Sequence, residues 1–134
     1  MNKKMLSLIT LIFCFSNALA DANFECVTDR VSGIHYNKKF NEWENATYLP
    51  GERFVITERG ENSYHVTRAG LNTSWSASCT RRTDQTEDSF SCMDGAEQFH
   101  FNRKELRFTA FRSFGYWNGS TDSLSISIGR CFPE

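Results

Sequence analysis

The clearest pattern along this chain is an alternation of apolar and polar residues that ends at Cys79. One series is mostly apolar and the positions between are polar: Leu71, Thr73, Trp75, Ala77 and Cys79 alternate with Asn72, Ser74, Ser76 and Ser78. A period of two places neighbouring side chains on opposite faces of a β-strand. This segment is therefore expected to be a strand with one face in a core and the other in water.

Two further strands are expected directly after this segment. Phe90 and Cys92 share one face of the first, and the Asp94-Gly95 turn leads into the second. Large aromatic side chains on one face of a strand favour a buried position. The core is expected to include four of them: Trp75, Phe90, Phe99 and Phe101.

Short β-rich runs separated by polar turns recur along the rest of the chain. They are Phe24 to Val27, Val31 to Tyr36, Arg53 to Glu58, Ser63 to Arg68, and a last run in which Leu124, Ile126 and Ile128 alternate with serines. The polar stretch from Asn37 to Tyr48 is expected to be a loop on the core or to contain one helical turn. Asn102 to Glu105 fits a turn or a helix-capping box, but the aromatic and β-branched residues from Leu106 to Trp117 favour a strand.

These runs add up to about eight strands with no long helix between them. Such a pattern is typical of a closed antiparallel barrel or a two-sheet sandwich, and we rank the small barrel first. No convincing repeat, linker or low-complexity tract divides the chain. A single all-β domain is expected from Asp21 to Glu134.

The first twenty residues have the pattern of a secretory signal peptide. They begin Met-Asn-Lys-Lys, continue through an apolar run that is too short to span a bilayer, and end in an Ala-x-Ala sequence at Ala20. We expect cleavage after Ala20 and a mature protein in the periplasm or outside the cell, with no membrane span.

Four cysteines then remain, and an even number in an exported chain indicates disulfides. Four cysteines allow three pairings, and we favour Cys26 with Cys131 and Cys79 with Cys92, because one bridge then ties the termini and the other a local loop.

The charge of the mature chain argues against nucleic acid as a partner. Lys3 and Lys4 leave with the signal peptide, so 13 basic residues face 16 acidic ones and the net charge is about −3. Nucleic-acid binding proteins are generally basic. No pair of cysteines or histidines has the spacing of a metal site, and no motif indicates a cofactor.

Catalytic chemistry has little support in this sequence. There is no Gly-x-Ser-x-Gly motif, and His35, His65 and His100 each stand alone on an expected strand. His100 with Glu97 is a weak pair. The neighbouring acids are Glu42 with Glu44 and Glu87 with Asp88, and both pairs lie in expected loops, where solvated charge is their ordinary role. We therefore expect a protein that is not an enzyme, with a hydrolase as the least favoured reading.

Two groups of residues are candidates for binding. The loop between Cys79 and Cys92 would be held at its base by their disulfide, and a loop fixed in advance loses less entropy when it binds. Its polar members are Arg81, Arg82, Asp84, Glu87 and Asp88. The second group consists of Phe111, Phe114, Tyr116 and Trp117, with Arg112 among them. Most of these aromatic residues are expected in the core, with Tyr116 and Trp117 as the exposed candidates.

This chain resembles small periplasmic proteins of Gram-negative bacteria in its size, its signal peptide, its cysteines and its β content. This loose type includes lysozyme inhibitors and immunity proteins against toxins. The resemblance implies a protein-binding module of inhibitor or immunity type, with another protein as its partner. The alternative is a barrel that binds a small apolar or sugar ligand in an aromatic interior.

Overall fold

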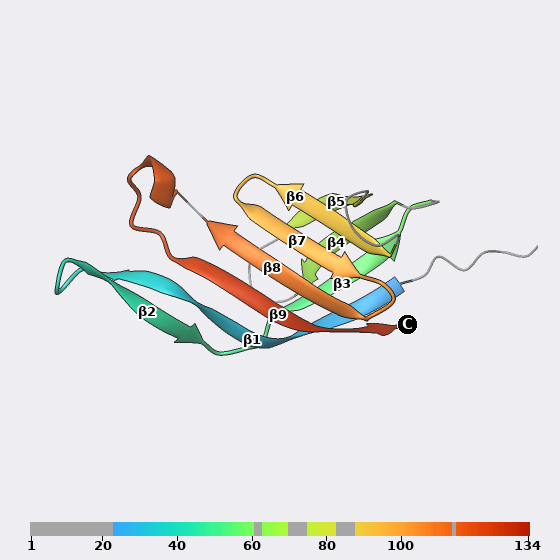
Figure 1. Cartoon of the computed structure of the whole chain (residues 1–134), viewed down its shortest axis with the longest axis horizontal. Coiled ribbons are helices and arrows are strands. Elements are labelled where there is room, and N and C mark those ends of the chain that lie inside the picture. Colours follow the sequence, from blue (N-terminus) through green and yellow to red (C-terminus); the bar gives the residue numbers. More distant parts are fainter. Residues whose placement is uncertain (1–22, 61–62, 70–74, 83–87, 114) are drawn as a thin grey trace, which may run out of the picture.

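The computed structural model describes residues 23–60, 63–69, 75–82, 88–113 and 115–134. The described chain is all-β apart from one short 3-10 helix, η1 (Tyr116–Asn118) (Figure 1). Its nine strands are β1 (Asn23–Asn37), β2 (Glu42–Tyr48), β3 (Arg53–Glu58), β4 (Tyr64–Ala69), β5 (Ser76–Arg81), β6 (Ser89–Asp94), β7 (Glu97–Asn102), β8 (Arg107–Ser113) and β9 (Leu124–Pro133). The all-β prediction is confirmed. Among the described residues, no helix is both long and apolar enough to cross a bilayer.

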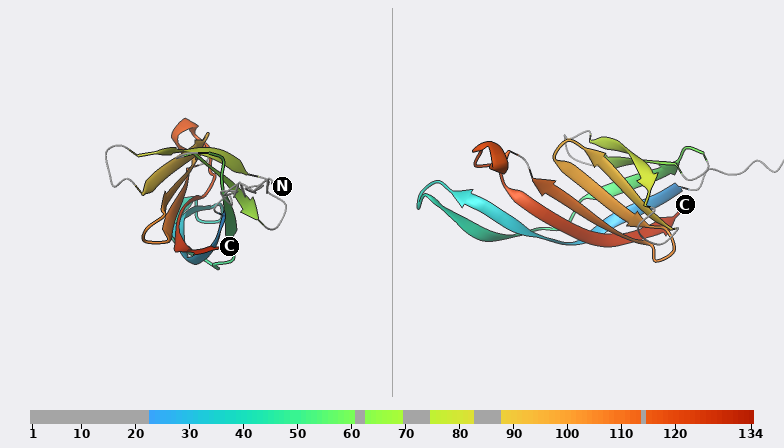
Figure 2. Two further views of the ribbon diagram at one scale, coloured as in Figure 1. Left: turned by 90° about the vertical axis from the view of Figure 1, so that its right-hand side faces the viewer. Right: turned by 45° about the horizontal axis from the view of Figure 1, so that its top comes forward.

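Eight of the strands close into an antiparallel barrel. Each strand from β3 to β8 pairs with the strand that follows it in the chain, and β1 closes the ring by pairing with both β3 and β9. Viewed from one end, the strands form a ring (Figure 2). Of the two architectures that the sequence left open, the barrel is the one observed. Closure satisfies the backbone groups that a sandwich would leave at its edges.

The N-terminal strand is longer than the sequence suggested. Two short strands were expected on either side of Thr28, whereas β1 runs through both, with a register shift between Thr28 and Arg30 where Asp29 is the extra residue. The shift turns Arg30 outward after the inward-facing Thr28. Beyond it, β1 pairs with β2 on one side and stays paired with β9 on the other as far as Ile34 (Figure 1).

The expectation of a loop or helical turn between Asn37 and Tyr48 is wrong. Most of this stretch is β2, which pairs with β1 from Val31 to Asn37 and forms a hairpin that projects past the barrel. Asn41 turns the chain with a φ of 56°, a conformation that asparagine tolerates better than most residues. We call residues 31–48 the projecting hairpin. Of its spaced aromatics, Trp43 packs on Tyr36 and Tyr116, and Phe40 is exposed.

The region from Leu106 to Trp117 is a strand only in its first part. β8 ends at Ser113, and η1 follows between Gly115 and Gly119, which have φ values of 57° and 92°. Positive φ angles are easily adopted by glycine and stop a strand. The preference for strand over helix is thus confirmed for β8, whereas Tyr116 and Trp117 belong to η1.

The lumen of the barrel is filled by aromatic side chains. All four aromatic residues expected in the core are buried, and neighbouring rings pack at centroid distances such as 4.9 Å between Phe54 and Phe99 and 4.4 Å between Tyr64 and Phe90. Trp75, Ala77 and Cys79 point inward while Ser76 and Ser78 face outward, as the alternation predicted. Leu71 and Thr73, the first apolar-series positions of that predicted strand, lie outside the described residues. Dense aromatic packing of this kind dominates the stability of a small core.

Both expected disulfides are present and buried. Cys26 of β1 is bonded to Cys131 of β9, and Cys79 of β5 is bonded to Cys92 of β6. In each case the two residues are directly opposed in the strand register. The first bond therefore closes the barrel seam, and the second joins neighbouring strands at the base of the loop that contains residues 83–87.

Charged side chains cover one end of the aromatic lumen. Arg68 of β4 lies between Glu52 and Glu97, and Arg112 of β8 contacts the same two carboxylates, so four residues form a ring of alternating charge across the barrel. The side chains of Arg68 and Glu97 are each only 8% exposed. The Arg68 guanidinium also lies over the rings of Phe54 and Trp75. We call these four residues the ion-pair ring.

A third arginine, Arg103, covers the opposite end. Arg103 donates hydrogen bonds to the Tyr64 hydroxyl at 3.1 Å and to Asp88 Oδ1 at 2.8 Å, and its guanidinium lies over the ring of Phe90. These hydrogen bonds raise the pKa of Arg103 above its usual range. The lumen is thus a packed core with a polar cover at each end.

Candidate functional site

The last strand places its apolar side chains on the outside of the barrel. Ser127 and Gly129 of β9 are buried, whereas Ile126 and Ile128 are 46% and 50% exposed. The inward positions must be small because a Cβ on Gly129 would lie 2.4 Å from the Phe108 ring and 2.2 Å from the Val27 carbonyl oxygen. The space that β9 would need for large inward residues is thus already occupied.

These outward isoleucines belong to a wider apolar surface. Phe111 of β8 is opposite Ile126 in register and is 36% exposed, and Leu124 is opposite Ile34 of β1. A shallow groove of about 280 Å³ runs between them, with Ser32, Gly33 and Ser125 as its small residues. We call Ile34, Phe111, Leu124, Ile126 and Ile128 the outer apolar face. Contiguous exposed apolar groups of this kind are typical of interaction sites.

Arginines surround one half of this face. Arg30 is opposite Ile128 on β1, and Arg107 and Arg130 are opposite each other on β8 and β9. Arg130 forms two hydrogen bonds with Asp29, which lower the pKa of that carboxyl. These four described residues thus place three guanidiniums and one carboxylate beside the outer apolar face, although the net charge of the chain is negative.

The described members of the predicted loop, Arg81, Arg82 and Asp88, lie at one end of the barrel. Arg81 ends β5, Arg82 follows it, and Asp88 binds Arg103. Asp84 and Glu87 lie outside the described residues. Arg82 reaches His100 on the outer side of β7, where its Nη1 lies 3.4 Å from Nδ1 of that histidine.

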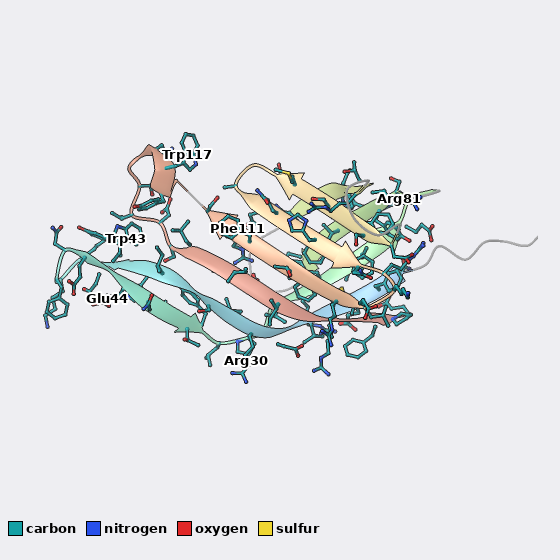
Figure 3. All side chains as sticks on the ribbon, in the orientation of Figure 1. Arg30, Trp43, Glu44, Arg81, Phe111 and Trp117 are labelled. Atoms are coloured by element: carbon teal, nitrogen blue, oxygen red, sulfur yellow. A yellow bond between two sulfur atoms is a disulfide. The ribbon has the colours of Figure 1, made fainter. Side chains whose placement is uncertain are left out.

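The other two predicted binding residues lie at the opposite end. Trp117 is 80% exposed on η1, and Tyr116 packs edge to face on Trp43 of the projecting hairpin at 5.0 Å. Figure 3 shows Trp117 and Trp43 at one end of the long axis and Arg81 at the other, with Phe111 between them. The structure therefore does not bring the two predicted groups together. The outer apolar face lies between them.

The histidines form no catalytic arrangement with acids among the described residues. His100 faces outward and Glu97 inward into the ion-pair ring, so the weak pair suggested by sequence does not form. His35 contacts Glu44 at 3.4 Å on the projecting hairpin. Within the described part of the chain, no group of three or more histidine, cysteine or acidic residues is arranged to hold a metal ion.

His100 instead has a partly buried polar environment on β7. The Ser91 hydroxyl lies 3.1 Å and the Arg82 guanidinium 3.4 Å from its Nδ1. A guanidinium can only donate, so Nδ1 accepts and the proton of the neutral ring is on Nε2. Burial, followed by the charge of Arg82, lowers the pKa of His100.

A cavity of about 200 Å³ lies beside His100. Polar groups from four segments line it: Arg82, Ser89, His100, Asn102, Arg107 and Thr109. Phe90 and Phe101 also line it, and their side chains are buried in the core. We call it the β7–β8 cavity, because His100 and Thr109 are opposite each other on these strands.

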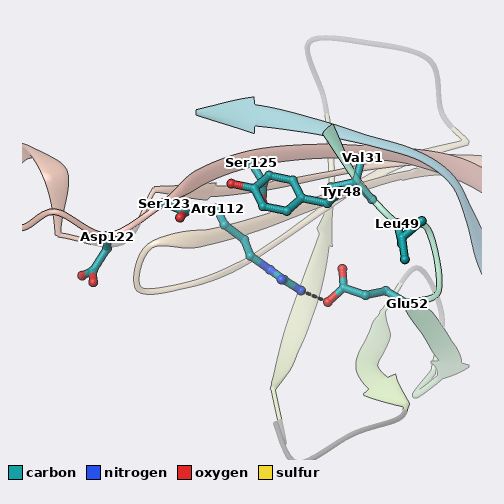
Figure 4. Close-up of a pocket in the computed structure, with 8 residues that line it drawn as sticks. All are labelled: Val31, Tyr48, Leu49, Glu52, Arg112, Asp122, Ser123 and Ser125. Atoms are coloured by element: carbon teal, nitrogen blue, oxygen red, sulfur yellow. Dashed lines mark hydrogen bonds and ion pairs between the residues drawn. The ribbon is translucent and has the colours of Figure 1, made fainter. Parts of the chain in front are cut away.

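A larger pocket of about 510 Å³ opens at the barrel end that carries the ion-pair ring (Figure 4). Its walls include Tyr48, the last residue of the projecting hairpin, and Leu49, which follows it. Arg112 points toward Glu52 across the pocket. Asp122 stands apart from this pair in the figure. The pocket lies outside the aromatic lumen, at the mouth of the barrel.

Sequence reasoning did not identify the outer apolar face. The alternation from Leu124 to Ile128 was visible, but a period of two does not tell which side faces the core. Phe111 was grouped with aromatic residues of which most were expected to be buried. The signal that could have located this face is the pairing of β8, β9 and β1, which sequence spacing does not provide.

No protein-family model, curated protein or solved structure matches this chain.

Proposed function

We propose that this protein is an exported protein-binding module of the inhibitor or immunity type, and that it binds its partner through the outer apolar face. The observation that carries the proposal is the orientation of β9, which exposes Ile126 and Ile128 while its serine and glycine face inward. Burying such side chains against a partner contributes about 25 cal/mol for each Å² of apolar surface removed from water.

The surroundings of this face support a protein as the occupant. Interfaces typically have an apolar centre and a polar rim in which arginine is enriched. Here Phe111 and the two isoleucines form the centre, and Arg30, Arg107 and Arg130 lie beside them. The excess of guanidiniums favours a partner that is acidic where it meets the rim, since opposite charges steer association and fix its orientation.

The rigidity of the outer apolar face also supports a protein-binding function. β8, β9 and β1 are paired along their length in the closed barrel, and the Cys26–Cys131 disulfide fixes the seam between β1 and β9. A surface that is ordered before binding loses little conformational entropy in the complex. The two disulfides also fit export to an oxidising compartment, which the leader pattern predicts.

The alternative of a small ligand inside the barrel is less well supported. Tightly packed rings fill the lumen, and the ion-pair ring and Arg103 cover its ends. A small ligand would have to occupy the mouth pocket of about 510 Å³ instead. Native mass spectrometry of protein isolated under mild conditions distinguishes the two functions, because a co-purifying small molecule supports the alternative.

The proposed function is tested by affinity purification with three forms of the mature protein. The wild type is compared with I126S/I128S, which removes exposed apolar groups, and with L49S, which changes a 94% exposed leucine away from the outer apolar face. The expected result is a protein retained by the wild type and L49S but lost with I126S/I128S. The activity of that protein should then fall when the purified wild type is added. Equal recovery of the same proteins by I126S/I128S and wild type would overturn the proposal.

A further inference from the structure

We propose that the β7–β8 cavity is a binding site for a single oxyanion, such as a sulfate, a phosphate or a carboxylate group. The cavity has a volume of about 200 Å³, and its polar lining consists of groups that can donate hydrogen bonds. Two guanidiniums, an imidazole, an amide and two hydroxyls contribute to it: Arg82, Arg107, His100, Asn102, Ser89 and Thr109. No carboxylate is among the described residues that line it.

Arg107 provides the main charge for this site. Its side chain makes no hydrogen bond or ion pair with another described residue, whereas its neighbour Arg130 is paired with Asp29 at 2.8 Å. A guanidinium presents several N–H groups in a fixed plane and forms strong, short bonds to oxyanions. An anion in the cavity would therefore gain a partner that no other described residue neutralises.

His100 contributes a second donor. Its Nδ1 accepts a hydrogen bond from the Arg82 guanidinium, so the ring proton is on Nε2. This Nε2–H has no partner among the described residues. The neutral ring can thus donate one hydrogen bond without becoming charged. The described charged groups that line the cavity with His100 are Arg82 after β5 and Arg107 on β8; its cross-strand neighbours, Ser91 and Thr109, are uncharged. Their positive potential favours an anion and disfavours a proton on His100.

The frame of the site is formed before any ligand binds. His100 and Thr109 are opposite each other on β7 and β8, Arg107 is opposite Asn102, and Asn102 Nδ2 donates to the Ser89 hydroxyl at 3.4 Å. Phe90 and Phe101 anchor the cavity wall in the core. Donors that are already ordered lose little entropy on binding.

The oxyanion could be a free ion or a carboxylate of the protein partner proposed above. The site itself does not depend on that partner, because its groups come from β6, β7, β8 and Arg82 and not from the outer apolar face. Sulfate is the better first probe, since its charge does not change between pH 5 and pH 8. Acetate then represents a carboxylate of comparable size.

The test is a titration of the folded mature protein followed by amide NMR, with sulfate compared with chloride at equal ionic strength. We expect saturable shifts confined to residues around the cavity, among them Ser91, His100 and Thr109. Replacing Arg107 by glutamine should weaken sulfate binding about tenfold, as expected for the loss of a charge-assisted hydrogen bond. R130Q is the matched control, because Arg130 is the register neighbour of Arg107 but is already paired with Asp29.

The outcomes separate this proposal from the previous one. Saturation by sulfate that R107Q weakens and R130Q leaves unchanged supports the site, whether or not a protein partner is found. Stronger shifts with acetate than with sulfate identify a carboxylate, and hence an acidic side chain, as the natural occupant. Shifts with sulfate that match those with chloride, or equal weakening by R107Q and R130Q, overturn the proposal.

Discussion

Cys26 and Cys131 are directly opposite each other on β1 and β9, with their Cα atoms 3.9 Å apart, and their disulfide spans the seam at which the barrel closes. Because β1 is the first strand and β9 the last, this bond joins segments 105 residues apart in the sequence. The Cys79–Cys92 bond, by contrast, spans only 13 residues between consecutive strands. The two bonds therefore constrain the unfolded chain to very different extents.

Removing the seam disulfide should destabilise the protein more than removing the local one. On the loop-entropy model, a loop of about 100 residues corresponds to about 4.7 kcal/mol and one of about 15 residues to about 3 kcal/mol. The measurement is urea unfolding of C26A/C131A and C79A/C92A, each followed by tryptophan fluorescence. All four positions are buried, so both variants also lose comparable core packing. A larger loss of unfolding free energy in C79A/C92A would contradict this expectation.

The ion-pair ring should be sensitive to the removal of a single charge. Arg68→Met leaves the buried Glu97 carboxylate with only Arg112, at 3.5 Å, as its partner in the ring. Breaking a buried pair on one side typically costs about 3–5 kcal/mol, whereas replacing both partners by apolar residues is often close to neutral. The double variant R68M/E97M should therefore be more stable than R68M. Equal unfolding midpoints for these two variants would show that the two charges are not coupled.

Gly129 should not tolerate a methyl group. A Cβ there would meet the Val27 carbonyl oxygen at 2.2 Å and the Phe108 ring at 2.4 Å, so Gly129→Ala must move backbone or a core ring. Overpacking of this kind costs about 1–3 kcal/mol or more. Gly51→Ala is the control, since nothing lies within 4 Å of its added Cβ. Thermal unfolding should show a clear decrease in midpoint for G129A and little change for G51A.

The pKa of His100 should lie below the ordinary value of about 6.5 and should rise when sulfate binds. Burial and the charge of Arg82 disfavour the protonated ring, so the folded state binds fewer protons than the unfolded state. Stability is therefore lost as the pH falls from about 6.5 through the lower folded pKa. Bound sulfate would partly neutralise Arg82 and Arg107, and by linkage a protonated ring would then bind sulfate more tightly.

NMR titration of the His100 ring in chloride and in sulfate at equal ionic strength measures this pKa directly. Replacing His100 by asparagine should also remove its part of the stability loss at low pH, which urea unfolding at pH 7.5 and pH 5 can detect. The same His100 pKa in both salts would count against anion binding near the ring. A pKa above 6.5 in chloride would contradict the effect of burial and Arg82.

Local patterns predicted most of the strands and the presence of disulfides. The alternation around Trp75 and Cys79 predicted correctly which residues of β5 are buried, because a half-buried strand must alternate. Where the pattern was weak the prediction failed. Spaced aromatics in a polar stretch did not reveal β2, since Trp43 packs on Tyr36 and Tyr116 outside the barrel core.

The sequence by itself determined that this protein is an all-β chain with four paired cysteines, because alternation and cysteine number are local or compositional properties. Only the tertiary structure decided that the strands close into a barrel and which side of β9 faces the lumen. Ile126 and Ile128 became surface residues because the Phe108 ring and the backbone of β1 already occupy the space beneath β9. Arg82, His100 and Arg107 came to line one cavity because β6, β7 and β8 pair in a particular register. Both candidate sites thus depend on contacts between strands, which no single strand specifies.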